Sequence, residues 1–180
     1  SRQLLTDVNF YLNEGDKVGI IGINGTGKST FLKVLAGAVE PDEGSVKLDP
    51  NVQVSFLSQN PDMQDDATVL EQVFLHFPEE FRALNEYEAK SMLMKLGLSV
   101  FDQKVGTLSG GQRKRVALVA ALVHPADILV MDEPTNHLDS EMVAWLEQKL
   151  IAFPGAIVMV THDRYFLERV ATRIAELSRA

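Results

Sequence analysis

The chain has 180 residues, of which 46% are hydrophobic and 23% charged, so it is long enough for one domain with its own core. Its net charge of -8 argues against a domain that grips RNA or DNA by itself, because such domains carry a basic excess. No apolar run approaches the roughly 18 residues of a membrane-spanning helix, no secretory leader is visible, and there is no cysteine for disulfides or thiolate metal sites. We therefore expect a cytoplasmic domain without direct membrane insertion.

Strands and helices alternate along most of the chain. In chain order, the expected elements are strands at 8–12 and 17–23, a helix at 28–36, strands at 44–48 and 52–57, a helical stretch at about 60–107, a helix at 109–123, a strand at 128–131, a helix at 139–152, a strand at 156–160, a helix at 163–171 and a strand at 173–177. Such alternation predicts an α/β fold with a mostly parallel sheet covered by helices. We read 1–180 as a single domain with a core of 1–59 and 108–180 and an inserted helical lobe at 60–107.

The loop after the second strand has the composition of a phosphate cradle. Residues 22–29 read GINGTGKS, two glycines separated by four residues and followed by Lys-Ser. Successive backbone N–H groups can point at phosphate oxygens only in a tight turn that glycine tolerates, and the following helix adds its positive end. A chance match in a glycine-containing loop is the alternative, but the strand before it and the helix after it favour the phosphate site. The expected nucleotide contacts are Asn24, Gly25, Thr26, Gly27, Lys28, Ser29 and Thr30.

Two carboxylates, Asp132 and Glu133, end the apolar run at 128–131. Taken alone, they are more simply a strand that stops at charged residues. A phosphate loop in the same chain favours a functional role for the two carboxylates, because P-loop enzymes hold Mg²⁺ with an Asp at the end of a neighbouring strand. We expect Asp132 and the Ser29 hydroxyl to bind Mg²⁺, and Glu133 to accept a proton from the attacking water.

A second glycine-containing helix start lies at Ser109, Gly110, Gly111 and Gln112. By itself it indicates a Ser-capped helix with free N–H groups at a positive end. The string LSGGQ at 108–112, placed between the phosphate loop and the acidic pair, resembles the signature motif of ABC ATPases.

Three further residues match motifs of that family in the right order. Gln59 resembles the Q-loop glutamine, His162 the switch histidine, and Asp139 the loop that meets a partner domain. Alone, each has a simpler reading: a loop glutamine, a structural histidine and a helix N-cap. Together with the two glycine motifs they cover nearly the whole chain.

The resemblance implies a P-loop (RecA-like) α/β fold with a mostly parallel sheet flanked by helices, a small antiparallel β part and the inserted helical lobe. It implies ATP and Mg²⁺ as ligands, and two ABC domains that sandwich two nucleotides head to tail, in one longer chain or as a homodimer. The implied site comprises Gln59, Glu133 and His162 for catalysis, Ser29, Gln59 and Asp132 for the metal, and, beside residues 24–30, Ser109, Gly110, Gly111, Gln112 and Asp139 for the nucleotide.

The wording at 133–139 (EPTNHLD) and 162–167 (HDRYFL) resembles the ABC-F branch, whose members carry two ATPase domains and act on ribosomes or in stress resistance. This implies the ribosome as a candidate partner. One domain is present here, no long helical arm is visible near 82–85, and Phe10 and Tyr11 lie after the position of the adenine-stacking aromatic, so we expect a fragment of a two-domain protein. A transporter motor domain and a nucleotide-gated clamp with little hydrolysis are the alternatives.

Overall fold

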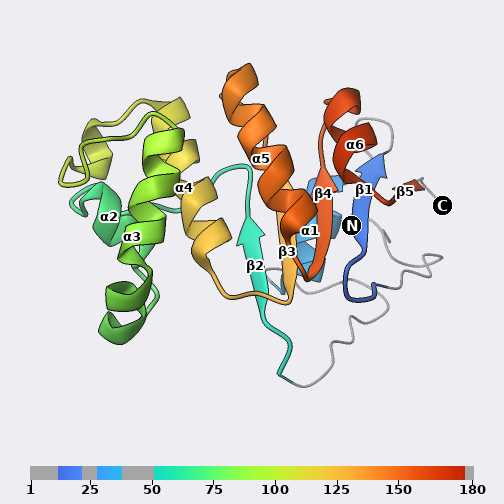
Figure 1. Ribbon diagram of the computed structural model, residues 1–180, viewed down its shortest axis with the longest axis horizontal. Helices are drawn as coiled ribbons and strands as arrows, with labels where there is room; N and C mark the ends of the chain where they lie inside the picture. The colour runs from blue at the N-terminus through green and yellow to red at the C-terminus, as the bar shows by residue number, and fades with distance from the viewer. Residues whose placement is uncertain (1–11, 22–27, 38–50, 177–180) are drawn as a thin grey trace. The chain divides into compact units, whose positions relative to one another are not determined.

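The computed structural model describes residues 12–21, 28–37 and 51–176, with the side chains of 29, 30 and 34 excepted. Two compact units divide the chain (Figure 1). The first unit comprises 1–59, 126–134 and 147–180, and the second comprises 60–125 and 135–146.

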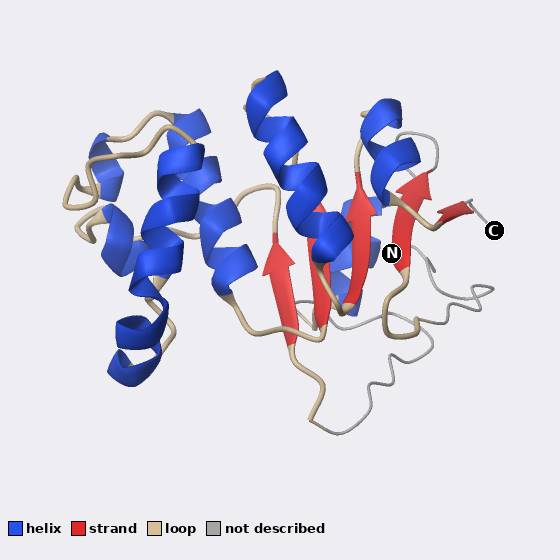
Figure 2. Cartoon of the chain, in the orientation of Figure 1, coloured by secondary structure: helices blue, strands red, loops and turns tan. Residues whose placement is uncertain are grey.

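The first unit is built on a five-stranded sheet in the order β2-β3-β4-β1-β5, in which every described pairing is parallel. Figure 2 shows the strands as red arrows. Their bounds are β1 Lys17–Ile21, β2 Val54–Leu57, β3 Ile128–Asp132, β4 Ala156–Val160 and β5 Arg173–Glu176. Because all strands run the same way, the residues that follow them gather at one edge of the sheet.

Helices α1 (Lys28–Leu35) and α6 (Arg164–Val170) pack against opposite sides of β1. Successive strand residues point to opposite faces. Val18 and Ile20 form a buried cluster with Phe31 of α1. A Cβ added to Gly19, between them, would run into Leu167 of α6, so the sequence needs glycine there for α6 to pack closely. The other core residues of this cluster are Leu32, Val130, Val158 and Val160.

The second unit is helical. It contains α2 (Val69–Val73), α3 (Glu79–Lys95), the short 3₁₀ helix η1 (Val105–Thr107), α4 (Gly110–Val123) and the start of α5 (Ser140–Ala152). Both α2 and α3 pack on α4, around buried apolar side chains of which Leu93, Leu96 and Val116 are almost inaccessible to solvent. This unit begins at Asn60, where the expected lobe begins, and it also holds α4 and residues 135–146.

The observed elements confirm the predicted α/β fold with a parallel sheet, and β4 has the predicted bounds. The expected antiparallel part is not seen, because every strand in the described ranges runs parallel to its neighbours. The expected strand at 44–48, and all of the one at 8–12 except Leu12, lie outside the described residues; Leu12 itself is not in a strand. None of the helices in the described ranges is long and apolar enough to cross a bilayer.

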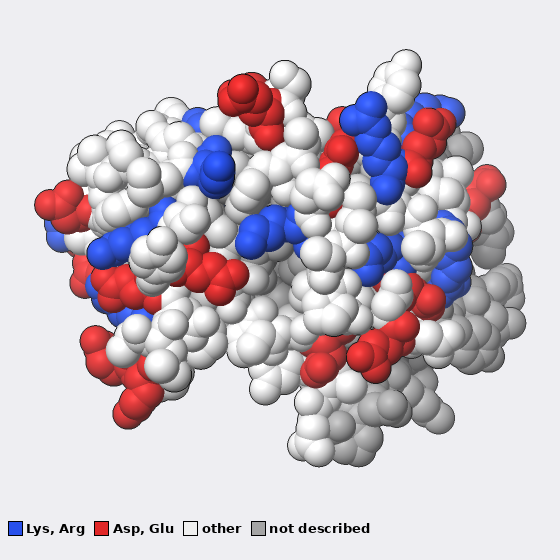
Figure 3. Space-filling model, in the orientation of Figure 1, with Lys and Arg blue, Asp and Glu red and all other residues white. Residues whose placement is uncertain are grey.

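Charged residues are mixed on the face shown in Figure 3, where Lys and Arg alternate with Asp and Glu among the described residues. That face carries no extended basic surface in the part of the chain that is described. The view agrees with the acidic net charge, which already argued against a domain that holds a nucleic acid by itself.

His124, directly after α4, is an uncompensated polar group in the second unit. Its ring packs edge-on against Phe77, with centroids 5.3 Å apart, and its buried Nδ1 has no hydrogen-bond partner among the described residues. Burial lowers the pKa of this imidazole. The folded state therefore takes up a proton less readily than the unfolded state, and the free energy of unfolding should fall as pH drops below about 6.5.

His124→Phe should remove this pH-dependent loss and add about 1 kcal/mol of stability near neutral pH, because a buried nitrogen without a partner disappears. Urea unfolding at about pH 7.5 and about pH 5.5 measures both effects. His76→Phe, at an exposed position of the same unit, is the control for the loss of an imidazole. An equal loss of stability on acidification in the parent and in His124→Phe would contradict the assignment.

Candidate nucleotide-binding site

The carboxyl ends of β1, β3 and β4 bring the site residues of the first unit to one edge of the sheet. Asp132, the last residue of β3, lies opposite Val160, the last residue of β4, and Val160 is in register with Ile20 of β1. Glu133 directly follows Asp132, and His162 lies two residues beyond Val160, so both come just after the ends of neighbouring strands. Such an edge is where open parallel sheets bind their ligands.

Asp132 is only 4% exposed. A carboxylate that is this buried stays charged only when a cation or hydrogen-bond donors compensate it. Mg²⁺ takes oxygen ligands and is commonly held by one or two carboxylates together with substrate phosphates, so this carboxylate fits the metal that the sequence implies. Gln59 is exposed, two residues beyond the end of β2, and the side chain of Ser29 is outside the description.

Glu133 has an unusual backbone that fixes where its carboxylate lies. Its φ of 51° is in the left-handed region, and its N–H donates to the carbonyl of Val160 at 2.7 Å. Its Oε2 accepts the backbone N–H of His162 at 3.3 Å, and its Oε1 lies 3.4 Å from His162 Nε2. The Glu133 side chain is 10% exposed and that of His162 is 74% exposed. A shielded carboxylate is thus held beside an accessible imidazole.

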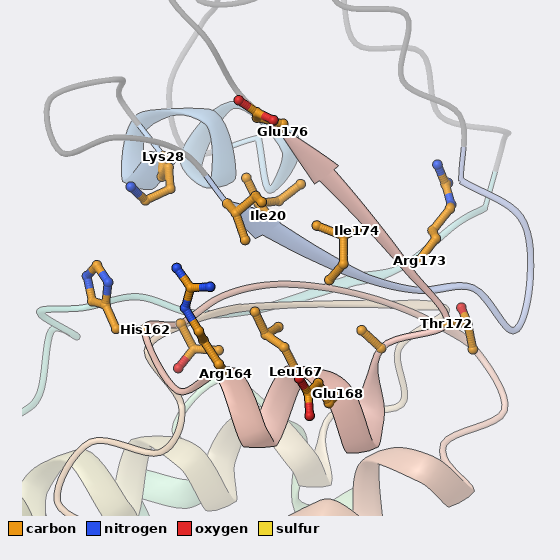
Figure 4. A pocket seen from close by; sticks show the side chains of 13 residues that line it. Ile20, Lys28, His162, Arg164, Leu167, Glu168, Thr172, Arg173, Ile174 and Glu176 are labelled. Atoms are coloured by element: carbon orange, nitrogen blue, oxygen red, sulfur yellow. The ribbon is translucent and has the colours of Figure 1, made fainter.

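A pocket of about 600 Å³ opens beside this edge in the first unit. Lys28, the first residue of α1, lies at its rim together with His162 and Arg164 (Figure 4). Ile20, Leu167 and Ile174 make up part of its apolar lining. Glu168 and Glu176 also line the pocket, which therefore combines basic and acidic groups with apolar surface.

The other expected phosphate contacts are residues 24–27, Ser29 and Thr30. Residues 24–27 lie outside the described ranges, and Ser29 and Thr30 are placed in α1 without their side chains. Lys28 is the member of the cradle whose side chain is described.

The signature residues belong to the second unit, where Ser109 is the N-cap of α4. Its Oγ accepts the N–H of Gln112 at 3.1 Å, while Oε1 of Gln112 accepts the N–H of Ser109 at 2.9 Å. This capping box occupies the side chain of Gln112. The N–H groups of Gly110 and Gly111 in the first turn have no intrahelical acceptor, and Ser109 and Gly110 are exposed. The turn is suited to an anion.

Asp139 is the cap of α5. Its Oδ1 accepts the N–H of Met142 at 2.9 Å, and its carbonyl accepts the N–H of Val143 at 2.9 Å. Asp139 is therefore a helix N-cap, as its simpler interpretation predicted. The residue is also exposed and so accessible to a partner domain.

Comparison with known proteins decides the family. A family model described as ABC transporter matches residues 5–136, which is well over half of the chain. The chain belongs to the ABC transporter family. It is one of the ATP-binding domains of that family, and the family hydrolyses ATP.

The ABC domain is 40% identical over 215 residues to YfmR of Bacillus subtilis, an uncharacterized ABC transporter ATP-binding protein, and 35% identical over 216 residues to the energy-dependent translational throttle protein EttA of Escherichia coli K12. Each match covers 99% of this chain, and 34% and 39% of the relatives. Both relatives are of the ABC-F type. A solved structure of the archaeal ribosome recycling factor aABCE1 with the ribosomal stalk protein aP1 matches with a TM-score of 0.77 and 32% identity, covering 92% of this chain and 32% of that one.

YfmR and EttA are longer than this chain within the matched region, whereas the match to the putative ATP-binding protein YdiF of Bacillus subtilis, also 40% identical, runs over 177 residues. The match to YfmR runs over 215 residues and this chain has 180, so at least 35 residues of YfmR have no counterpart in the ABC domain. In this chain, residues 82–85 lie inside the continuous helix α3.

Arg164 is a pocket residue that the sequence reading did not place in the site. In the sequence it belongs to the HDRYFL run at 162–167. Its place two residues after His162 is the signal that could have indicated a pocket residue, because α6 begins close to the end of β4 at the sheet edge.

Proposed function

We propose that the ABC domain binds Mg-ATP and hydrolyses it in a head-to-tail pair of ABC domains. The observation that carries the proposal is the Glu133 carboxylate, held by His162 directly after the buried Asp132. Lys28 begins α1 beside the same pocket, where its ammonium group suits the β- and γ-phosphates.

Each residue then has a distinct task. Glu133 accepts a proton from the attacking water, and its near burial keeps the carboxylate in one place. The accessible His162 ring lies where it can contact both Glu133 and the γ-phosphate. Asp132, Ser29 and Gln59 would hold Mg²⁺, which neutralises charge on the phosphates when it is bound.

The second half of the site comes from a partner domain in this proposal. Ser109 and the free N–H groups of Gly110 and Gly111 form an anion-binding turn. Applied to the γ-phosphate of the partner's nucleotide, these N–H groups would stabilise its negative charge. Asp139 belongs to the surface that meets the partner.

We further propose an ABC-F-type role in translation or stress resistance, with the ribosome as partner. EttA is named a translational throttle, and aABCE1 is named a ribosome recycling factor. YfmR has at least 35 residues without a counterpart in this chain, and our proposal places an additional arm near 82–85 in the longer protein. Co-sedimentation of the longer protein with ribosomes tests this role, whereas co-purification with a membrane subunit would favour the transporter motor.

Ser109→Asp tests the head-to-tail site with little damage to the helix. Asp is as good an N-cap as Ser, so α4 should persist, while its negative charge would face the γ-phosphate. We expect hydrolysis to fall by about 10²-fold or more, with the chain's own affinity for Mg-ATP unchanged. Phosphate release and calorimetry measure the two quantities.

Thr68→Asp is the matched control, because Thr68 caps α2 with the same type of capping box. It should leave hydrolysis at the parent rate. A mixture of Ser109→Asp chains with Glu133→Gln chains should regain activity, since one of the two composite sites in a mixed pair has both Glu133 and Ser109 intact. A mixture as inactive as its components would argue against the head-to-tail arrangement.

A further inference from the structure

The two glycines of the signature turn have different surroundings. A Cβ added to Gly110 would meet no described atom within 4 Å. A Cβ added to Gly111 would lie 3.3 Å from the Cβ of His137 and 3.4 Å from its Nδ1, which is tighter than ordinary van der Waals contact. Within the second unit, Gly111 therefore makes room for His137, whereas no described neighbour requires glycine at position 110.

The loop 135–139 holds His137 in an uncommon conformation. Its φ is 65°, in the left-handed region, where His is one of the few side chains found with some frequency. The N–H of Leu138 donates to the carbonyl of Thr135 at 3.2 Å on one side, and Asp139 caps α5 on the other. His137 is exposed, so burial of its own surface does not explain why it lies against α4.

Arg115 also contacts the first turn of α4 and connects it to the end of α3. Arg115 donates from Nη1 to the carbonyl of Leu96 at 2.8 Å and from Nε to the carbonyl of Gly111 at 3.3 Å. The carbonyl of Gly111 thus accepts from Arg115, and His137 lies next to the place where a Cβ on Gly111 would be. These contacts join the end of α3 and the loop 135–139 to the same residue of the turn.

We propose that His137 is a positioning residue for the nucleotide of the partner domain. By packing on Gly111, it sets the first turn of α4 so that Ser109 and Gly110 face the phosphates. Gly111 is the glycine that His137 requires, and Gly110 is the glycine that the close approach of the ligand requires. The inference rests on the proposed function. It connects the first turn of α4 with the loop 135–139, which begins two residues after Glu133 in the sequence.

A suppressor experiment in the 180-residue chain tests the assignment. Gly111→Ala should lower ATP hydrolysis about tenfold or more by displacing the turn. His137→Gly alone should lower hydrolysis, because the turn loses the side chain that packs on it. In the double variant the new methyl group at position 111 fills part of the space that the imidazole leaves, and glycine suits the left-handed φ, so most of the loss in Gly111→Ala should be recovered. Gly110→Ala should also lose activity, and His137→Gly should not restore it.

Calorimetry of Mg-ATP binding is the second readout. All variants should keep the parent's affinity, because the phosphate loop and Asp132 belong to the first unit, and this separates positioning from general damage. If Gly111→Ala does not fold, recovery of a cooperative thermal transition in the double variant supports the contact, and no recovery overturns it.

Three results would overturn the inference while the proposed function stands: full activity in Gly111→Ala, a double variant whose loss is the product of the two single losses, or rescue of Gly110→Ala by His137→Gly. A parent chain that binds Mg-ATP but never hydrolyses it would instead overturn the proposed function, and the inference with it.

Discussion

Glu133→Gln should lower the rate of ATP hydrolysis by about 10² to 10⁴-fold, the usual contribution of a general base, while Mg-ATP still binds. The amide has nearly the shape of the carboxylate, and its oxygen can still accept the N–H of His162 that Glu133 accepts at 3.3 Å. It cannot take a proton from water. Single-turnover phosphate release measures the chemical step, and calorimetry measures binding.

The same substitution should also trap the closed pair, because the nucleotide that holds two domains together is no longer consumed. Size-exclusion chromatography with Mg-ATP should then show a dimer that the parent forms only transiently. Glu168→Gln, which removes a carboxylate from the lining of the pocket that His162 also lines, is the control and should hydrolyse ATP like the parent. Hydrolysis by Glu133→Gln at the parent rate would mean that another group is the base.

Lys28→Ala should weaken Mg-ATP binding by about tenfold to a hundredfold, the range expected when a charge-assisted hydrogen bond is lost. Lys28 begins α1 at the rim of the pocket, and its ammonium group is the charged element of the phosphate cradle. Without it, the positive end of the helix and the loop N–H groups remain. Calorimetric titration with ATP and MgCl₂ measures the loss.

Lys33→Ala is the matched control, since Lys33 is an exposed lysine on the same helix, five residues further on. Its affinity should equal that of the parent. Equal affinities in Lys28→Ala and the parent would remove Lys28 from the site. A folded parent with no affinity for Mg-ATP would remove the whole proposal.

Local patterns predicted most of the elements, because short apolar runs and caps act within a few residues. The strand at 156–160 has all five residues buried, and a continuous apolar run reports burial on both faces directly. Ser109 was expected to cap its helix and does so. The order of strands in the sheet could not be predicted in this way, since it depends on which distant segments pair.

The predicted antiparallel part came from resemblance and not from a pattern in the residues, and it is not seen among the described strands. The helical lobe was predicted as a stretch, but not its individual helices. The outward side of α3 carries Leu84 and Tyr87 at 85% and 88% exposure, so its apolar residues do not mark one buried face.

For the site, the resemblance to ABC ATPases implied roles for both Glu133 and His162, and the structure places their side chains 3.4 Å apart. The contact between Gly111 and His137 could not be predicted, because the two residues are far apart in the sequence and no pattern connects them. It depends on a backbone φ of 65° that the sequence permits without requiring.

The burial of Asp132 has a consequence for how long the protein survives. A metal nucleotide that binds only the folded domain, next to this buried carboxylate, would stabilise the folded state by mass action. The resting domain should therefore open more often than the loaded one. When cellular ATP runs low, proteases would find more of the chain accessible, so its abundance would follow the energy supply of the cell.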